Sequence, residues 1–257
     1  MICIPESCCV LTSRGYVPAD LLDNTLEIIS YDGIPHKIES VNKLGKSNYY
    51  VSKIRSTKIK IPTYFLPDTK LLSGSDFYEV NVLDSDSVSL GVGFDHKIFK
   101  VLSFPELIPL FFSIFGFQIN RINRILTEEP GLYPQALLQV QLDRRYSTGR
   151  FFSGFLGLDK ENRRELLRRL TKDYTSKKIK FSRHPEDIFS LWECLWVVSP
   201  GLYISMVNKE GFMRVNIDET RDYNKIEYNY LVQIDTGLVE INSKSTTAVI
   251  NGYVVSI

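Results

Sequence analysis

The first candidate for chemistry is a cysteine placed two residues from the start of the chain. Cys3 is followed by the β-prone Val10–Thr12, a turn at Ser13–Gly15, and a second apolar run ending at Leu22. A thiol ionises more readily than an alcohol and is therefore the better nucleophile near neutral pH. A cysteine in this setting can equally be a small buried residue at the start of a strand, so the surrounding residues must decide.

A run of basic side chains is the second group with chemical potential. Residues 159–183 contain ten Lys or Arg and only four acids, although the whole chain is balanced at 31 Lys+Arg against 30 Asp+Glu. Such a cluster predicts either a surface that faces phosphate groups or a solvated helix face. The residues we assign to a nucleic-acid interface are Arg144, Arg145, Arg163, Arg164, Arg168, Arg169, Lys177, Lys178 and Lys180.

Composition sets the broad class of the protein. With 257 residues and 44% hydrophobic content, the chain can bury the core of one large or two smaller domains. Four cysteines without a C-x-x-C pair indicate neither a disulfide framework nor a zinc site, which favours the cytoplasm or another reducing intracellular compartment. The apolar run at 102–117 is too short to span a bilayer and is interrupted by prolines, so we expect no membrane contact.

The pattern of elements changes twice along the chain. Residues 10–92 and 228–257 predict short β-strands separated by turns, whereas the middle predicts helices over Glu161–Lys172 and Glu186–Val198 with strands around them. We therefore expect a β domain split by an α+β insertion of about 130 residues, which is tolerated when its ends leave and rejoin the host close together. The predicted bounds are 1–94, 95–225 and 226–257.

Both ends of the chain resemble the conserved blocks of inteins and related Hint domains. Cys3–Leu22 resembles the opening block of this family. Thr247–Ile257, with an apolar strand, Asn-Gly and three apolar residues, resembles the closing block. The resemblance implies a mainly β, horseshoe-like fold in which the first and last strands meet. It also implies that Cys3 is the nucleophile of an N-to-S acyl shift, and that Ser256 occupies the position next to the family's terminal asparagine.

The same resemblance identifies parts that are missing. Thr69 falls where the family has the histidine that protonates the scissile amide, and threonine cannot do so near neutral pH; His96 is an alternative. Counting back from the tail places Leu238 at the position of a conserved Asp, with Asp235 as an alternative. Ile257 has no side-chain amide to cyclise, so complete splicing is excluded for the sequence as given. Cys3 could still form a thioester and release Met1 and Ile2.

The middle segment resembles the LAGLIDADG homing endonucleases. Phe152–Asp159 is similar to the motif helix, with Asp159 at its acidic position. The resemblance implies that Asp159 is a catalytic residue and a ligand for Mg²⁺, with DNA as the partner. Two such acids are required, and Asp143 and Asp95 are the remaining candidates. Cleavage therefore implies a homodimer or a second motif.

Taken together, the sequence predicts an intein-derived protein: a Hint domain interrupted by a LAGLIDADG-like insert, with decayed protein splicing and a retained nucleic-acid-binding surface. Its candidate catalytic residues are Cys3, Thr69, Asp159 and Ser256. Two alternatives stay open. One is an active Mg²⁺-dependent homing endonuclease with residual thioester chemistry. The other is a structural subunit of a host protein assembly in which both sites are relics.

Overall fold

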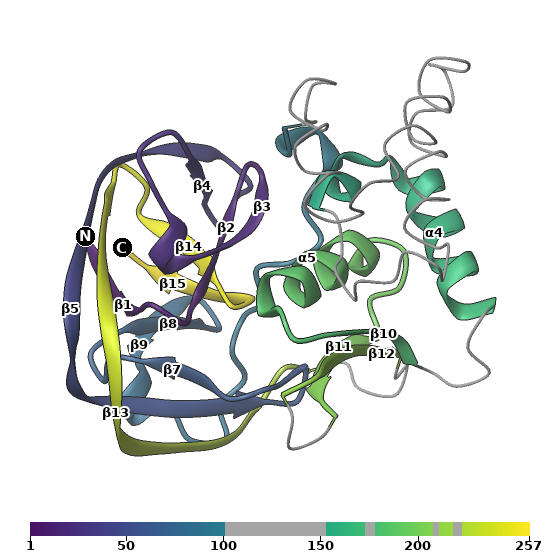
Figure 1. Cartoon of the computed structure of the whole chain (residues 1–257). Helices are drawn as coiled ribbons and strands as arrows, with labels where there is room; N and C mark the ends of the chain where they lie inside the picture. Colours follow the sequence, from purple (N-terminus) through teal and green to yellow (C-terminus); the bar gives the residue numbers. More distant parts are fainter. Residues whose placement is uncertain (101–152, 173–177, 208–210, 218–222) are drawn as a thin grey trace.

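The structure is a computed structural model that describes residues 1–100, 153–172, 178–207, 211–217 and 223–257. β-Strands are the predominant regular structure of the described chain (Figure 1). The elements before residue 95 are β1 (Ile2–Pro5), β2 (Cys9–Thr12), β3 (Gly15–Pro18), η1 (Ala19–Leu21), β4 (Glu27–Ile29), β5 (Pro35–Ser56), β6 (Ile59–Lys60), β7 (Thr63–Phe65), β8 (Lys70–Ser73), β9 (Asp76–Glu79) and η2 (Val80–Val82).

The later elements include the two α-helices predicted from the sequence, each placed within two residues of the predicted bounds. These elements are η3 (His96–Ile98), η6 (Ser153–Gly157), α4 (Lys160–Lys172), β10 (Lys178–Ser182), α5 (Pro185–Trp196), β11 (Leu202–Met206), β12 (Met213–Ile217), β13 (Ile226–Ser243), β14 (Thr247–Ile250) and β15 (Tyr253–Ser256).

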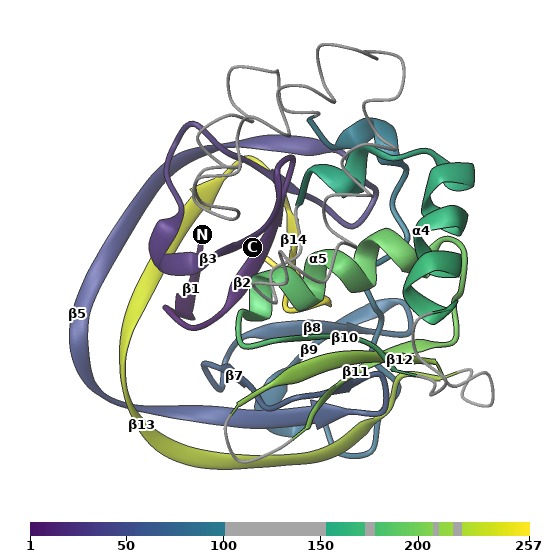
Figure 2. The same ribbon diagram turned by 45° about the vertical axis from the view of Figure 1, so that its right-hand side comes forward.

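Two long strands, β5 and β13, frame the β fold and curve around it (Figures 1 and 2). They pair antiparallel from Ser56 opposite Ile226 to Ile38 opposite Ser243, with three register shifts. An extra residue on one strand bends a ladder and increases its twist. One shift lies at Gly237, where an added Cβ would come 2.6 Å from the Glu6 carboxylate. Glycine therefore permits the close approach of the chain beyond β1.

As predicted, the first and last strands belong to one sheet. Its strand order is β1-β13-β5-β4-β2-β14-β15-β8-β9, with β3 on β2 and β7 on β5. Figure 1 marks both ends of the chain on the same part of this fold. The cysteines of this sheet and of α5 are free thiols, in agreement with the absence of a disulfide framework.

The hairpin of β14 and β15 turns at Asn251 and Gly252, whose φ angles are +50° and +81°. A two-residue turn with both φ values positive matches the twist of its strands, and Asn-Gly is its preferred sequence. The Asn251 side-chain oxygen accepts a hydrogen bond from Cys9 N at 2.7 Å, and Asn251 N donates to Cys9 O at 2.8 Å. The turn thereby fixes the C-terminal hairpin against β2.

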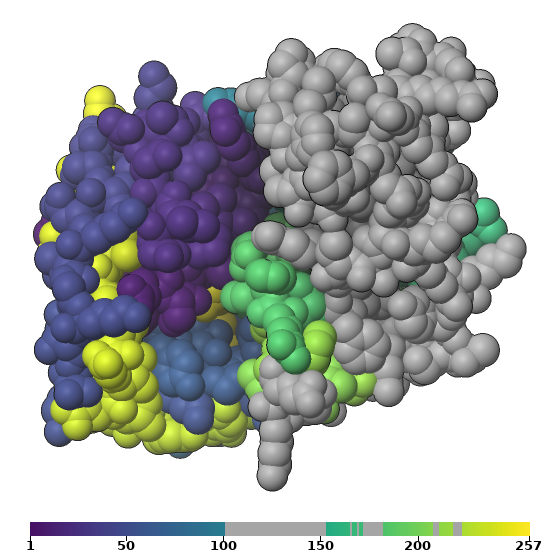
Figure 3. All heavy atoms as spheres, in the orientation of Figure 1, coloured from purple at the N-terminus to yellow at the C-terminus, as the bar shows by residue number. Residues whose placement is uncertain are grey.

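A second sheet has the order β10-β12-β11-β6 and combines strands of the middle segment with β6 of the N-terminal part. Helix α5 packs between this sheet and β3: Tyr16 lies 5.2 Å from Phe189 between ring centroids, and Tyr16 N donates to Ser190 Oγ. Figure 3 shows the described middle residues, in green, directly against the N-terminal strands. The buried side chains form one cluster that includes both parts. The described middle residues therefore share one hydrophobic core with the β-strands, and the predicted bounds of 1–94, 95–225 and 226–257 stay a prediction.

A buried carboxylate joins α5 to the segment that leaves the β fold. Glu193 is fully buried, and its oxygens accept from Gly93 N at 3.1 Å and from Phe94 N at 2.8 Å. Burial disfavours the charged form and raises the pKa of Glu193 from 4.5 to about 7, although these N–H groups and the nearby Arg163 oppose the shift. The same contacts hold the start of the middle segment on α5.

Replacing Gly252 with alanine should destabilise the protein by about 2 kcal/mol or more. The new Cβ would lie 2.5 Å from Trp192 Cζ3, in addition to the strain of φ +81°. Gly74→Ala is the matched control, because Gly74 has φ +64° and nothing within 4 Å of the added Cβ. Denaturant unfolding should show the smaller loss for Gly74→Ala. Equal losses would mean that Trp192 does not restrict the turn.

Glu193 should make the free energy of unfolding fall as pH rises between about 4.5 and 7. The folded-state pKa is the higher one, so in this window the unfolded chain ionises while the folded chain keeps its proton. Urea unfolding at pH 5 and pH 7.5 should show this decrease in the wild type and a smaller one in Glu193→Gln. Glu79→Gln, on the exposed β9, controls for the loss of one surface carboxyl. The same decrease in Glu193→Gln would contradict the assignment.

Candidate functional site

A hollow of about 350 Å³ lies where the two ends of the chain meet. Its lining includes three of the four predicted catalytic residues, although they are far apart in the sequence. The lining residues are Met1, Ile2, Cys3, Leu66, Asp68, Thr69, Lys70, Ser256 and Ile257. The structure thus brings Cys3, Thr69 and Ser256 together, and we call this hollow the terminal pocket.

Cys3 is placed in the terminal pocket by the pairing of β1 with β13. Cys3 stands directly opposite Glu240 in this antiparallel ladder, so the two side chains project from the same face. The thiol is partly buried, and burial raises its pKa, with smaller contributions from the negative charges of Glu240 and Asp68. The thiol is therefore protonated near neutral pH, and its use as a nucleophile requires a base.

Glu240 is a site residue that sequence reasoning missed. The expected position, Leu238, pairs with Pro5 and is buried, and Asp235 pairs with Asn48 on an exposed part of β13. Neither residue stands opposite Cys3 on this ladder. A usable signal was available, because Glu240 is the only carboxylate between Gly237 and Ser243. Its position on the ladder depends on the register of β1, which spacing alone does not give.

Thr69 is held at the start of β8 by its backbone. Its N–H donates to Leu66 O at 3.0 Å, and its carbonyl accepts from Val80 N at 2.7 Å. The residue is buried, at 7% exposure, and lines the terminal pocket. His96, the alternative for the missing imidazole, lies on η3 with its Nδ1 3.0 Å from Asp95 Oδ1, and lines a different pocket. The structure does not bring His96 to Cys3.

Ser256 and Ile257 complete the terminal pocket from the C-terminal hairpin. Ser256 pairs with Thr247 across the hairpin, and Ile257 N donates to Thr246 O at 2.9 Å. Val255, one residue earlier, pairs with Leu71 of β8, which links this strand to the segment that carries Thr69. The hairpin and β8 thus fix the far side of the pocket relative to β1.

Asp159 lies in a separate pocket of about 610 Å³ with Asp95, His96 and Glu161 among its lining residues. Its Oδ1 accepts from Asn162 N at 2.9 Å and from Asn162 Nδ2 at 3.2 Å, which satisfies donors at the start of α4. These hydrogen bonds lower the pKa of Asp159. Its observed role is that of a helix cap.

The donors around Asp159 do not fit the expected Mg²⁺ site. Within the described ranges, no three His, Cys, Asp or Glu side chains are grouped so that they could hold a metal ion. The preceding Ser153–Gly157 forms a 3-10 turn, in which two of the five residues are glycines, and not the α-helix of the motif. Asp143 lies outside the described residues. Magnesium therefore stays a prediction for this chain, and we assign no step to it.

The basic residues predicted to bind nucleic acid do not share one surface in the described part of the chain. Arg163 is buried: its Nε donates to Leu158 O at 2.8 Å, and its Nη2 donates to Leu156 O. Its assignment to a phosphate-facing surface is wrong, because the guanidinium supports the backbone before α4. Arg164 and Arg168 are exposed on α4. The others, or their side chains, lie outside the described residues: Arg144, Arg145, Arg169, Lys177, Lys178 and Lys180.

The described chain is thus a mainly β protein in which a cysteine of the first strand and a serine of the last share one pocket. Its sequence matches no known family profile and no curated protein. Among solved structures, it is similar to the crystal structure of the G-1F mutant of the Ssp DnaB mini-intein variant M86. That alignment covers 100% of this chain and 98% of the other, with 9% identity and a TM-score of 0.43. No helix of the described ranges is long and apolar enough to cross a membrane.

Glu240→Gln should make Cys3 react a few-fold faster with iodoacetamide near neutral pH. Removing the negative charge opposite the thiol lowers its pKa and increases the thiolate fraction. Peptide mass spectrometry would follow alkylation at Cys3, with the buried Cys8, Cys9 and Cys194 as internal controls for unfolding. Glu39→Gln, on the exposed part of β5, is the matched charge control. An unchanged rate at Cys3 would show that Glu240 does not act on the thiol.

Proposed function

We propose that this protein is intein-derived and that the first step of splicing is the chemistry its terminal pocket could retain. The observation that carries the proposal is the meeting of Cys3, Thr69 and Ser256 in one pocket at the ends of the chain. The arrangement was expected from the resemblance of the opening and closing segments to inteins and Hint domains. The reaction proposed for the terminal pocket is the transfer of the Ile2 acyl group from the nitrogen to the sulfur of Cys3, within the same chain.

In this step the sulfur of Cys3 attacks the carbonyl carbon of Ile2. The carbon–sulfur bond forms, the Ile2–Cys3 carbon–nitrogen bond breaks, and the nitrogen of Cys3 gains a proton. Glu240, opposite Cys3 on the ladder, is the base that takes the thiol proton. Water or an added nucleophile then cleaves the thioester and releases the residues before Cys3.

The later steps of splicing lack their usual groups. Thr69 offers a hydroxyl where an imidazole would protonate the leaving nitrogen, so we expect thioester formation to be slow. Ile257 follows Ser256 with a hydrocarbon side chain, which has no nitrogen to cyclise. The proposal is therefore limited to chemistry at Cys3, with splicing lost.

Intact mass after incubation with hydroxylamine tests this proposal. The expected result is a slow loss of Met1 and Ile2 that is absent in Cys3→Ala and reduced in Glu240→Gln. Cys194→Ala, a buried thiol of α5, is the matched control and should keep the release. An unchanged mass after prolonged incubation would exclude thioester formation at Cys3. It would favour the alternative of a structural or assembly subunit.

Duplex DNA binding by the middle segment is a second proposed function. It is supported by the four-stranded sheet, because none of the strands β6, β10, β11 and β12 contains an acidic residue. An acid-free sheet next to the exposed Arg164 and Arg168 favours a polyanionic partner. Endonuclease activity is not part of this proposal.

A gel-shift titration with duplex DNA at two salt concentrations tests the second function. Binding should weaken steeply with salt and should be lost in the double variant Arg164→Glu, Arg168→Glu. The pair Lys43→Glu, Lys46→Glu on the exposed part of β5 removes the same charge elsewhere and should have less effect. Absence of binding even at low salt would exclude this function.

A further inference from the structure

The segment from Lys53 to Lys60 contains four cations and no acid, and it runs from the end of β5 into β6. Three of these cations lie over tyrosine rings contributed by later strands. The pairs, measured from the cation to the ring centroid, are Lys53 with Tyr230 at 5.4 Å, Arg55 with Tyr228 at 5.8 Å, and Lys60 with Tyr203 at 5.0 Å. We call these six residues the cation–aromatic stripe.

Four residues of the stripe lie on the β5–β13 ribbon, and the other two, Lys60 and Tyr203, lie on β6 and β11 of the second sheet. Lys53 and Arg55 are two residues apart on one strand, so their side chains leave the same face, about 7 Å apart along β5. Between them Ile54 is directed into the core and is fully buried. Tyr228 and Tyr230 follow the same rule on β13, and their ring centroids are 5.3 Å apart. Cations and rings thus form two parallel rows on one surface.

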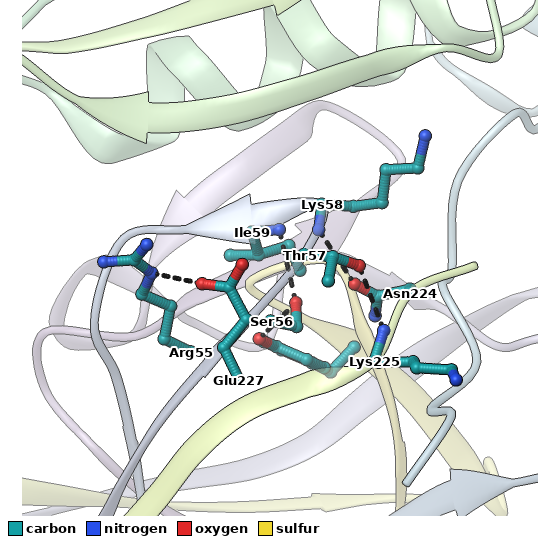
Figure 4. Close-up of polar contacts among 9 residues, drawn as sticks. Arg55, Ser56, Thr57, Lys58, Ile59, Asn224, Lys225 and Glu227 are labelled. Atoms are coloured by element: carbon teal, nitrogen blue, oxygen red, sulfur yellow. Dashed lines mark hydrogen bonds and ion pairs between the residues drawn. The ribbon is translucent and has the colours of Figure 1, made fainter. Parts of the chain in front are cut away.

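The groups of the stripe are accessible. Tyr230 is 46% exposed, and the Arg55 side chain is 38% exposed. The acid beside the stripe, Glu227, accepts from Nε of Arg55 at 2.7 Å, a contact that does not use the terminal nitrogens of the guanidinium (Figure 4). Lys58 differs from the others: it is buried, and its Nζ lies over Trp196. Lys58 is therefore a buried neighbour of the stripe and is not part of its accessible surface.

The positive surface continues past the end of β5. Lys225 is exposed, and its Nζ lies 5.9 Å from the centroid of Tyr223, which is 68% exposed. Thr57 fixes this neighbouring segment through two hydrogen bonds. Its Oγ1 donates to Tyr223 O, and Lys225 N donates to its Oγ1, the second of which is drawn in Figure 4. A further cation and a further ring are therefore held beside Thr57, past the end of β5.

We propose that the cation–aromatic stripe binds single-stranded nucleic acid. Proteins that bind single strands without sequence preference combine a positive track for the backbone with rings on which bases stack. The stripe supplies both at the spacing of alternate strand residues, so that successive phosphates and bases of an extended strand can be matched. A duplex hides its bases and would leave the exposed ring of Tyr230 and the half-buried ring of Tyr228 unused. The partner is identified by this chemistry as an extended polyanion with planar bases.

This inference goes beyond both proposed functions, because it uses neither Cys3 nor the arginines of α4. Fluorescence anisotropy of a labelled oligothymidine of about 16 nucleotides would measure binding to the full chain at several salt concentrations. Tyr230→Leu should weaken binding roughly tenfold through the loss of one stacked base, while Tyr230→Phe should retain it. Lys53→Gln should lower the slope of log affinity against log salt by about 0.7.

Lys43→Gln is the matched control, because Lys43 is exposed on the same strand outside the stripe. It should change neither affinity nor slope, and thermal unfolding would confirm that each variant is folded. Three results would overturn the proposal: no binding of the oligothymidine at low salt, an unchanged affinity for it in Tyr230→Leu, or an equal effect of Lys43→Gln and Lys53→Gln. The release of Met1 and Ile2 from Cys3 is independent of all three, so either proposal can fail alone.

Discussion

The long antiparallel ladder between β5 and β13 is the constraint on which the rest of the molecule depends. It pairs residues from Ile38 to Ser56 with residues from Ser243 to Ile226, and its register shifts bend it around the remaining strands. On its other side β13 pairs with β1, and the register of that second ladder determines which residue faces Cys3. A shift of one residue would turn Glu240 away from the thiol and place an apolar side chain there. The electrostatics of the terminal pocket are therefore a consequence of strand register.

The molecule separates its chemistry-bearing residues into different surroundings. Cys3 lies in a pocket between chain ends, where burial, with smaller contributions from the charges of Glu240 and Asp68, raises the pKa of the thiol. Asp159 lies in another pocket and caps a helix, and Arg163 is enclosed by backbone carbonyls. Residue type alone made all three look functional. Burial and partners distinguish a group that can react or bind from one that supports the backbone.

Local patterns predicted much of the fold. The pattern of side chains predicted two helices that match α4 and α5 within two residues, and it predicted short strands before and after them. The strands β5 and β13 are instead long, because they pair with each other through polar stretches. The shared core was also missed: contacts such as Tyr16 with Phe189 join distant segments, and no local pattern encodes them. Cys3, Thr69 and Ser256 line one pocket, and their role there stays a prediction, whereas finding Glu240 required the register.

The tight contact between the terminal hairpin and α5 has a consequence for how such a chain can change over time. Trp192 packs on Gly252, and its indole N–H donates to Leu202 O, so the helix supports the hairpin on one side and the second sheet on the other. A lineage that discarded this helix would expose the hairpin turn and the face of β3 to water. Point substitutions at Cys3 or at Ile257 leave those contacts intact. Change in the terminal pocket is thus open to this architecture by single steps, whereas loss of the helix requires a compensating repacking.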